Sequence, residues 1–185
     1  MTSNMMNRSF VLVSRPKGMP VESDFRLEDT PVPNPGPGEI VIRNHYASLD
    51  PAIRGWLDDA PSYLPPVALG DPVRASTIGV VEASNVDRFK PGDWVMGLNR
   101  IEHYSVVAPD DFMHPIDISL APSPTAYLSA MGAVGLTAWF GVNDVMKPEP
   151  GQTLLVSGAA GAVGSMVGQL AKLRGARVVG IAGGT

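Results

Sequence analysis

The chain has 185 residues, of which 44% are hydrophobic and 17% are charged, as is typical of a globular protein with one large or two small domains. Its net charge of −4 gives no reason to expect nucleic acid or a membrane surface as a partner. Because cysteine is absent, disulfides, thiolate zinc sites and cysteine nucleophiles are excluded. The N-terminal segment lacks a signal-peptide core and no apolar run has membrane-spanning length, which predicts a cytoplasmic protein.

The first part of the chain consists of short apolar runs separated by Pro, Gly and Asp, a pattern that predicts a β-barrel or sandwich. Such runs are EIVIRNHYAS (39–48), STIGVVEAS (76–84), DWVMGL (93–98) and EHYSVVAPDD (102–111). The second and third flank a predicted turn at residues 90–93. Every proline and every acidic residue lies at or before Pro150, so we expect a different architecture in the last part of the chain.

The region that follows residue 123 is rich in Ala, Leu and Met, and its spacing predicts one or two helices that end at residues 147–150. Residues 153–157 form a short apolar run without alternation, which predicts a strand buried on both faces. A second strand is expected over residues 177–182.

The helix predicted between these two strands ends at Gly175, a residue suited to a helix C-terminus. Helical spacing places the following residues on one apolar face: Val163, Met166, Val167, Leu170 and Leu173.

The turn that joins strand and helix, AAGAVG (159–164), is similar to the G-x-G-x-x-G pattern of dinucleotide-binding folds, with alanine at the first glycine position. Gly161 lets the backbone approach a pyrophosphate, and Gly164 lets the helix pack closely on the strand. The helix N-terminus offers amides and partial positive charge to phosphates. The alternative is a tight turn whose small residues serve packing alone. The predicted cofactor-binding residues here are Ala160, Gly161, Ala162, Val163, Gly164 and Gly183.

The end of the second strand, around Gly183, carries no acidic residue. An NAD-dependent protein places an acid there to bind the adenosine ribose, and such an acid would repel the 2′-phosphate of NADP. The sequence therefore favours NADP. The alternative is NAD bound through residues that this chain does not contain.

Stretches from both parts of the chain carry a resemblance to a known family. They are NPGPGEIVIR (34–43), SLDPAIRGWLDDAPSYLPP (48–66), FKPGDWVMG (89–97), GAVGLTAWFG (132–141) and VSGAAGAVGSMVGQLAKLRGARVVGIAGG (156–184). They resemble the zinc-independent medium-chain dehydrogenases/reductases, and within them the NADP-dependent alkenal double-bond reductases, which include prostaglandin reductases (leukotriene B4 12-hydroxydehydrogenases) and curcumin reductase. The resemblance implies an α/β protein with a GroES-like β-barrel catalytic domain (1–124) and the first part of a Rossmann NADP-binding domain (125–185).

The resemblance also implies a reaction and its residues. Hydride from NADPH would reach the β-carbon of a small-molecule enone or enal, with Tyr63 as the catalytic hydrogen-bond donor and Pro51 and Thr137 beside the cofactor. Each has a structural alternative: Tyr63 as an exposed or packing residue, Pro51 as a turn proline, and Thr137 as a helix threonine bonded to the preceding turn. We expect no role for Arg54 and Arg74, which should be solvated, and core positions for Trp56, Trp94 and Trp139.

No metal site is expected. Zinc alcohol dehydrogenases of the same superfamily carry Cys and Gly-His-Glu where this chain has YASLDP and LGDPV, and the three histidines show no ligand spacing. Without zinc an alcohol lacks a Lewis acid, whereas a conjugated carbonyl needs only a hydrogen-bond donor.

Two strands do not complete a Rossmann sheet, so we expect the chain to be a fragment of a longer protein, which the resemblance implies is a homodimer. Two alternatives stay open for its function. One is a quinone oxidoreductase of the same superfamily, and the other is a short, non-catalytic GroES-like module.

Overall fold

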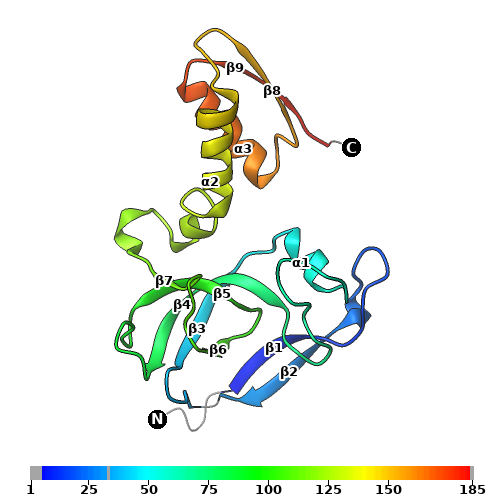
Figure 1. The fold of residues 1–185 in the computed structure, drawn as a ribbon, viewed down its shortest axis with the longest axis vertical. Helices are drawn as coiled ribbons and strands as arrows, with labels where there is room; N and C mark the ends of the chain where they lie inside the picture. The colour runs from blue at the N-terminus through cyan, green and yellow to red at the C-terminus, as the bar shows by residue number, and fades with distance from the viewer. Residues whose placement is uncertain (1–5, 33, 184–185) are drawn as a thin grey trace. The chain divides into compact units, whose positions relative to one another are not determined.

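The computed structural model describes residues 6–32 and 34–183 (Figure 1). The chain divides into two compact units, residues 1–120 and residues 121–185, called here the N-terminal and C-terminal units. Both strands and helices are present, which confirms the predicted α/β class. Within the described residues, every helix is too short or too polar to pass through a bilayer.

The N-terminal unit is mostly β-structure. Its β1 and β2 form an antiparallel pair, and its other strands form a five-stranded antiparallel sheet in the order β6-β3-β4-β5-β7. The elements are β1 (Met6–Leu12), η1 (Glu22–Asp24), β2 (Phe25–Pro31), β3 (Ile40–Ala47), α1 (Ala52–Trp56), β4 (Arg74–Ser84), β5 (Trp94–Arg100), β6 (Tyr104–Val107), β7 (His114–Pro115) and η2 (Ile118–Leu120).

The predicted barrel is only partly formed, because β6 and β7 remain unpaired edges of the five-stranded sheet within the described residues. Strand β1 approaches the rest of the unit through two isolated bridges, Ser9 to Glu102 and Val11 to Pro72. The hydrogen-bonded strands therefore make an open arrangement and not a closed barrel.

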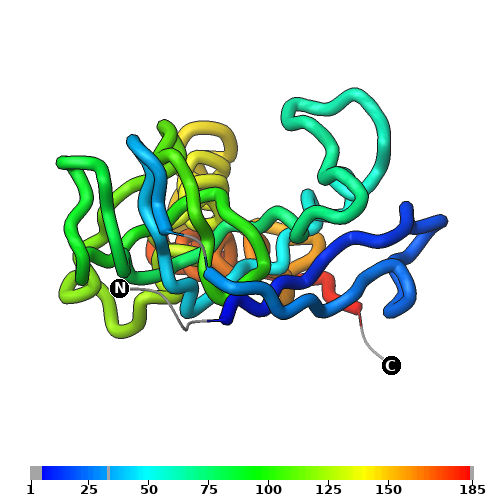
Figure 2. Tube along the Cα trace, turned by 90° about the horizontal axis from the view of Figure 1, so that it is seen from below, coloured from blue at the N-terminus to red at the C-terminus, as the bar shows by residue number. Residues whose placement is uncertain are grey.

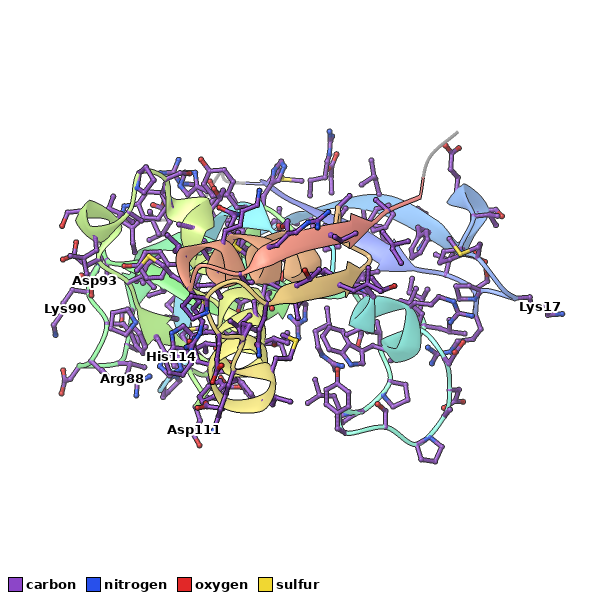
Figure 3. All side chains as sticks on the ribbon, turned by 90° about the horizontal axis from the view of Figure 1, so that it is seen from above. Lys17, Arg88, Lys90, Asp93, Asp111 and His114 are labelled. Carbon is purple, nitrogen blue, oxygen red and sulfur yellow. The ribbon has the colours of Figure 1, made fainter. Side chains whose placement is uncertain are left out.

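Two apolar clusters form the core of this unit. One contains Phe89 and neighbours from β3, β4 and β5, and the other joins Leu12 to Trp56 and Leu57. The predicted turn at residues 90–93 is confirmed: Gly92 has φ +95° and the Lys90 amide donates to Asp93 Oδ2 (2.7 Å). Figure 3 shows Lys90 and Asp93 at one end of the unit and Lys17 at the opposite end.

The C-terminal unit contains helices and one pair of parallel strands. Strand β8 matches the predicted bounds, and the helix end at Gly175 (φ +81°) is confirmed. The elements are η3 (Pro124–Leu128), α2 (Ala133–Phe140), the π-helical segment η4 (Gly141–Met146), β8 (Thr153–Ser157), α3 (Ala162–Leu173) and β9 (Arg177–Ile181).

Several burial predictions for this unit are wrong, and they include Val163 of the predicted apolar helix face, which is exposed. Leu155 of β8 is 62% exposed, because α2 and α3 pack on the side of Leu154 and Val156 only. Leu173 is 84% exposed at the end of α3, where the helix has passed beyond the packed surface. Trp139 is exposed as well, whereas Trp56 is in the core as predicted and Trp94 is half-buried.

Candidate functional site

The glycine turn between β8 and α3 depends on a residue that the motif comparison missed. Gly158 has φ +63°, a left-handed conformation that favours glycine, whereas Ala159 keeps negative φ. The Gly161 amide then donates to Gly158 O (2.9 Å), which closes the turn. Alanine therefore fits the first motif position, since the residue before it makes the left-handed turn.

Close packing explains two glycines of this site. A Cβ at Gly164 would overlap the backbone oxygen of Gly158, so the first turn of α3 rests directly on the turn residues. A Cβ at Gly180 of β9 would lie only 2.7 Å from Ala159 Cβ. The Ala159 amide also donates to Ile181 O (2.9 Å), so the turn and the end of β9 form one rigid corner.

The N-terminus of α3 points its backbone donors out of this corner. The first intrahelical bond runs from the Ser165 amide to Gly161 O (2.9 Å), so the amides of Ala162, Val163 and Gly164 precede the helical ladder. Among the described residues, the first turn of α3 has neither a capping side chain nor an acidic residue. Amide donors with the helix dipole behind them fit an anionic phosphate.

Gly183 follows β9 by two residues, and β9 ends beside this turn because β8 and β9 are parallel neighbours whose carboxyl ends meet at one edge. A Cβ at Gly183 would meet no atom, so packing does not require glycine there. Gly184 and Thr185, the residues that follow, lie outside the described residues.

The predicted cofactor residue Thr137 lies on the exposed side of α2. Its Oγ1 donates to Ala133 O (2.7 Å), as in the structural alternative of a threonine bonded to the preceding turn. The hydroxyl proton is therefore used within the helix, while the oxygen can still accept a hydrogen bond.

In the N-terminal unit, Pro51 and Tyr63 flank α1 and the loop that follows it. Pro51 caps α1 with φ −55° and is exposed. Figure 2 shows this loop, coloured cyan to green, projecting away from the strands. Tyr63 lies in it with 76% of its surface exposed, and its ring meets the Trp56 ring edge-on at 6.2 Å. Within the described residues its hydroxyl makes no hydrogen bond.

The prediction that Arg54 and Arg74 are simply solvated is wrong. Arg54 donates to Gly18 O (2.8 Å) and to Asp58 Oδ1 (2.7 Å), which ties α1 to the loop after β1. Arg74 is half-buried; it donates to Pro65 O (2.7 Å) and lies 5.7 Å from the Trp56 ring centroid. Burial lowers the pKa of Arg74, the charge of Arg100 lowers it further, and Tyr63 opposes this change.

The cluster of Trp56, Tyr63 and Arg74 was not predicted from the sequence. Trp56 Nε1 is buried and has no partner in the described part of the chain. A signal was present in the sequence, since Trp56 and Tyr63 lie in one proline-bounded stretch, but the arginine comes from a separate strand.

The three histidines do not form one cluster, because only two of them line the same cavity. His45 and His103 line a cavity of about 310 Å³ beside Arg8, whereas His114 lies on β7. No group of three or more His, Cys, Asp or Glu side chains suited to a metal ion occurs among residues 6–32 and 34–183.

A comparison with known families matches residues 8–114 to the N-terminal domain of oxidoreductases. Putative NADP-dependent oxidoreductase YfmJ of Bacillus subtilis is 48% identical over 93% of this chain and 50% of its own length. NADPH-dependent curcumin reductase of Escherichia coli is 43% identical over 96% of this chain and 51% of its length. The chain thus spans about half the length of the curated relatives it matches.

A solved structure extends this likeness to the fold. CurA from Vibrio vulnificus in complex with NADPH has a TM-score of 0.85 and 41% identity, over 96% of this chain and 52% of that chain. These matches confirm the resemblance to medium-chain reductases that the sequence motifs indicate.

Proposed function

Because this chain belongs to the family of oxidoreductase N-terminal domains, we propose that it forms part of an NADPH-dependent reductase of C=C bonds in α,β-unsaturated ketones and aldehydes. The observation that carries the proposal is the corner between β8 and α3, whose free amides and close packing fit a pyrophosphate. Relatives named NADP-dependent oxidoreductase and NADPH-dependent curcumin reductase support the cofactor, and the latter supports an enone substrate.

In this proposal the backbone of residues 160–164 holds the pyrophosphate, and Gly183 leaves space beside the adenosine ribose. Pro51 and Thr137 lie against the nicotinamide portion. Residues 1–124 form the catalytic domain, residues 125–185 begin the NADP-binding domain, and the complete protein is a homodimer.

NADPH supplies the hydride when it is bound. As the β-carbon of the substrate accepts the hydride, negative charge develops on the carbonyl oxygen. The Tyr63 hydroxyl, whose proton is not used elsewhere in the described residues, donates a hydrogen bond to this oxygen and stabilises the enolate. The α-carbon of the enolate then takes up a proton from solvent, which completes the reduction.

Activity is best tested in a chimaera in which this chain replaces the matching half of E. coli curcumin reductase. We expect NADPH-dependent reduction of enones, and a loss of about 100-fold in kcat for Tyr63→Phe, since one oxyanion donor is removed. The matched control is Tyr46→Phe, which changes an exposed tyrosine on β3, outside the loop that contains Tyr63. Reduction of quinones but not enones, or equal effects of the two variants, would contradict the proposal.

A further inference from the structure

Residues 57–67, called here the Tyr63 loop, follow α1 and project from the strands of the N-terminal unit (Figure 2). The two ends of the loop lie side by side, since the Val67 amide donates to Trp56 O (2.8 Å). Leu57 and Val67 are both buried, whereas Tyr63 in the middle of the loop is 76% exposed. The loop therefore has fixed ends and presents one aromatic side chain at the surface of the unit.

An arginine from another part of the chain joins both ends of the loop. Arg15 lies in the segment after β1, and its Nη1 atom is 2.8 Å from Leu57 O and 2.6 Å from Val67 O. This nitrogen carries two hydrogens, so it can donate one to each carbonyl at the same time. Hydrogen bonds from a charged donor are stronger than those between neutral groups. Arg15 therefore stabilises the closed base of the Tyr63 loop.

A second arginine holds the loop close to Tyr63 itself. Arg74 of β4 donates to Pro65 O (2.7 Å), and its guanidinium lies 5.7 Å from the Trp56 ring centroid. The Tyr63 ring meets the same Trp56 ring edge-on, with 6.2 Å between the two centroids. Arg74 thus fixes the backbone two residues after Tyr63 and also lies beside the ring against which Tyr63 packs.

The sequence of the loop restricts its movement further. Three prolines, Pro61, Pro65 and Pro66, each fix their own φ angle near −65°. Leu64 packs against the buried cluster that contains Trp56, so the loop is anchored at the residue next to Tyr63. An exposed side chain on a restrained backbone is already ordered before a ligand arrives, which lowers the entropic cost of binding.

We propose that Arg15 and Arg74 are positioning residues, which hold the Tyr63 loop so that the Tyr63 hydroxyl is in place to donate to the enolate oxygen. This inference rests on the proposed function, because it requires Tyr63 to be the hydrogen-bond donor. Both arginines act through the loop backbone and do not touch the substrate. Loss of either guanidinium frees the loop, and a group displaced by about 1 Å can lower a rate by about 100-fold.

The first test uses the 185-residue chain and does not depend on activity. NMR measures hydrogen exchange of the Val67 amide and the nuclear Overhauser effect between the Tyr63 and Trp56 rings. We expect Arg15→Gln to speed the exchange of Val67 by about tenfold and to weaken the Overhauser effect, because the hydrogen bonds that close the loop are lost. The Val81 amide in β4 serves as the internal reference.

The matched control is Arg43→Gln, which removes an exposed strand arginine that pairs with Glu82 (2.7 Å). It should alter neither signal. Arg74→Gln provides the same test if Arg15→Gln does not fold, with the Overhauser effect as its main readout. Unchanged signals in the folded variants would overturn the inference.

The second test uses the chimaera with curcumin reductase. Arg15→Gln should lower kcat about tenfold and change KM little, because Tyr63 acts on charge that develops only in the transition state. Arg15→Lys keeps a charged donor and should recover part of the loss. In a Tyr63→Phe background, Arg15→Gln should cause no further loss, since no donor remains to be positioned. An equal loss in both backgrounds would contradict the inference, because an effect on overall structure does not depend on Tyr63.

The two tests separate failure of this inference from failure of the proposed function. If the chimaera reduces no enone, the proposed function fails and the catalytic part of the inference fails with it, while NMR still shows whether the arginines hold Tyr63. If the chimaera reduces enones and Tyr63→Phe is impaired, but the NMR signals of Arg15→Gln and Arg74→Gln are unchanged, the proposed function stands and this inference is wrong.

Discussion

The N-terminal and C-terminal units differ in how completely they bury their apolar side chains. In the N-terminal unit, Phe89, Leu12 and Ile78 are fully buried, and a directed chain of hydrogen bonds crosses the interior. In the C-terminal unit the buried cluster is small, and large apolar side chains lie at the surface. The exposed ones include Leu136, Trp139, Phe140, Val145, Leu155 and Ile181.

This difference follows from the kind of sheet in each unit. An antiparallel sheet can cover itself with its own loops and hairpins, whereas parallel strands normally need cover on both faces. The pair β8 and β9 has helices on one side only, so its stability rests on few buried contacts. The C-terminal unit nevertheless forms a tight turn between β8 and α3, because the glycines that this turn requires lie within a few residues of one another.

The substitution with the largest expected effect tests whether the N-terminal unit unfolds independently of the C-terminal unit. Phe89→Ala should lower the free energy of unfolding of the N-terminal unit by about 4 kcal/mol, because a fully buried aromatic ring leaves a cavity. Hydrogen exchange of each unit, measured by mass spectrometry, reports the change. Equal loss of protection in α3 would show that the two units unfold together and not independently.

A second substitution tests the corner between β8 and α3. Gly164→Ala should destabilise the C-terminal unit by about 3 kcal/mol, because the new Cβ overlaps Gly158 O. Gly168→Ala in the same helix is the control: its Cβ would make an ordinary 3.6 Å contact with Val178, and alanine favours the helix by about 1 kcal/mol. Hydrogen exchange in α3 measures both. Similar effects of the two variants would show that close packing at Gly164 is not needed.

A third pair of substitutions tests how little of α3 is packed. Leu173→Gln should change the free energy of unfolding by less than about 0.5 kcal/mol, since the side chain is 84% exposed. Val167→Ala, at a buried position of the same helix, should cost about 1 to 2 kcal/mol. Urea denaturation followed by far-UV circular dichroism compares them. A larger cost for Leu173→Gln would mean that this end of the helix is covered in solution.

The smallest effect concerns pH and belongs to the N-terminal unit. The Ser14 hydroxyl (2.6 Å) and the Val21 amide (2.9 Å) donate to Asp24, and these bonds hold the pKa of its carboxyl below the usual value. The ionised form is therefore favoured by folding. Its contribution to stability is present at neutral pH and is lost as the pH falls below about 4.

Ser14→Ala should therefore destabilise the unit at pH 7 but have less effect at pH 3, as measured by urea denaturation at both values. A difference between wild type and variant that is the same at both pH values would mean that Ser14 does not act through the Asp24 charge.

The sequence predicted the local elements of the C-terminal unit well. Strand β8, helix α3 and the stop at Gly175 each depend on residues within a few positions of one another. The cluster of Trp56, Tyr63 and Arg74 was missed because its members come together only when the loop after α1 folds against β4.

By itself, the sequence determined the order of strands and helices in the C-terminal unit and the small residues of the corner between β8 and α3, since apolar period, proline and glycine act locally. Only the tertiary structure decided which face of β8 is covered, that Arg74 is half-buried, and that Asn99 is linked through other strands to Glu102. Burial and hydrogen-bond direction depend on residues far apart in the chain, and a local pattern of residue types does not show which of these residues will be in contact.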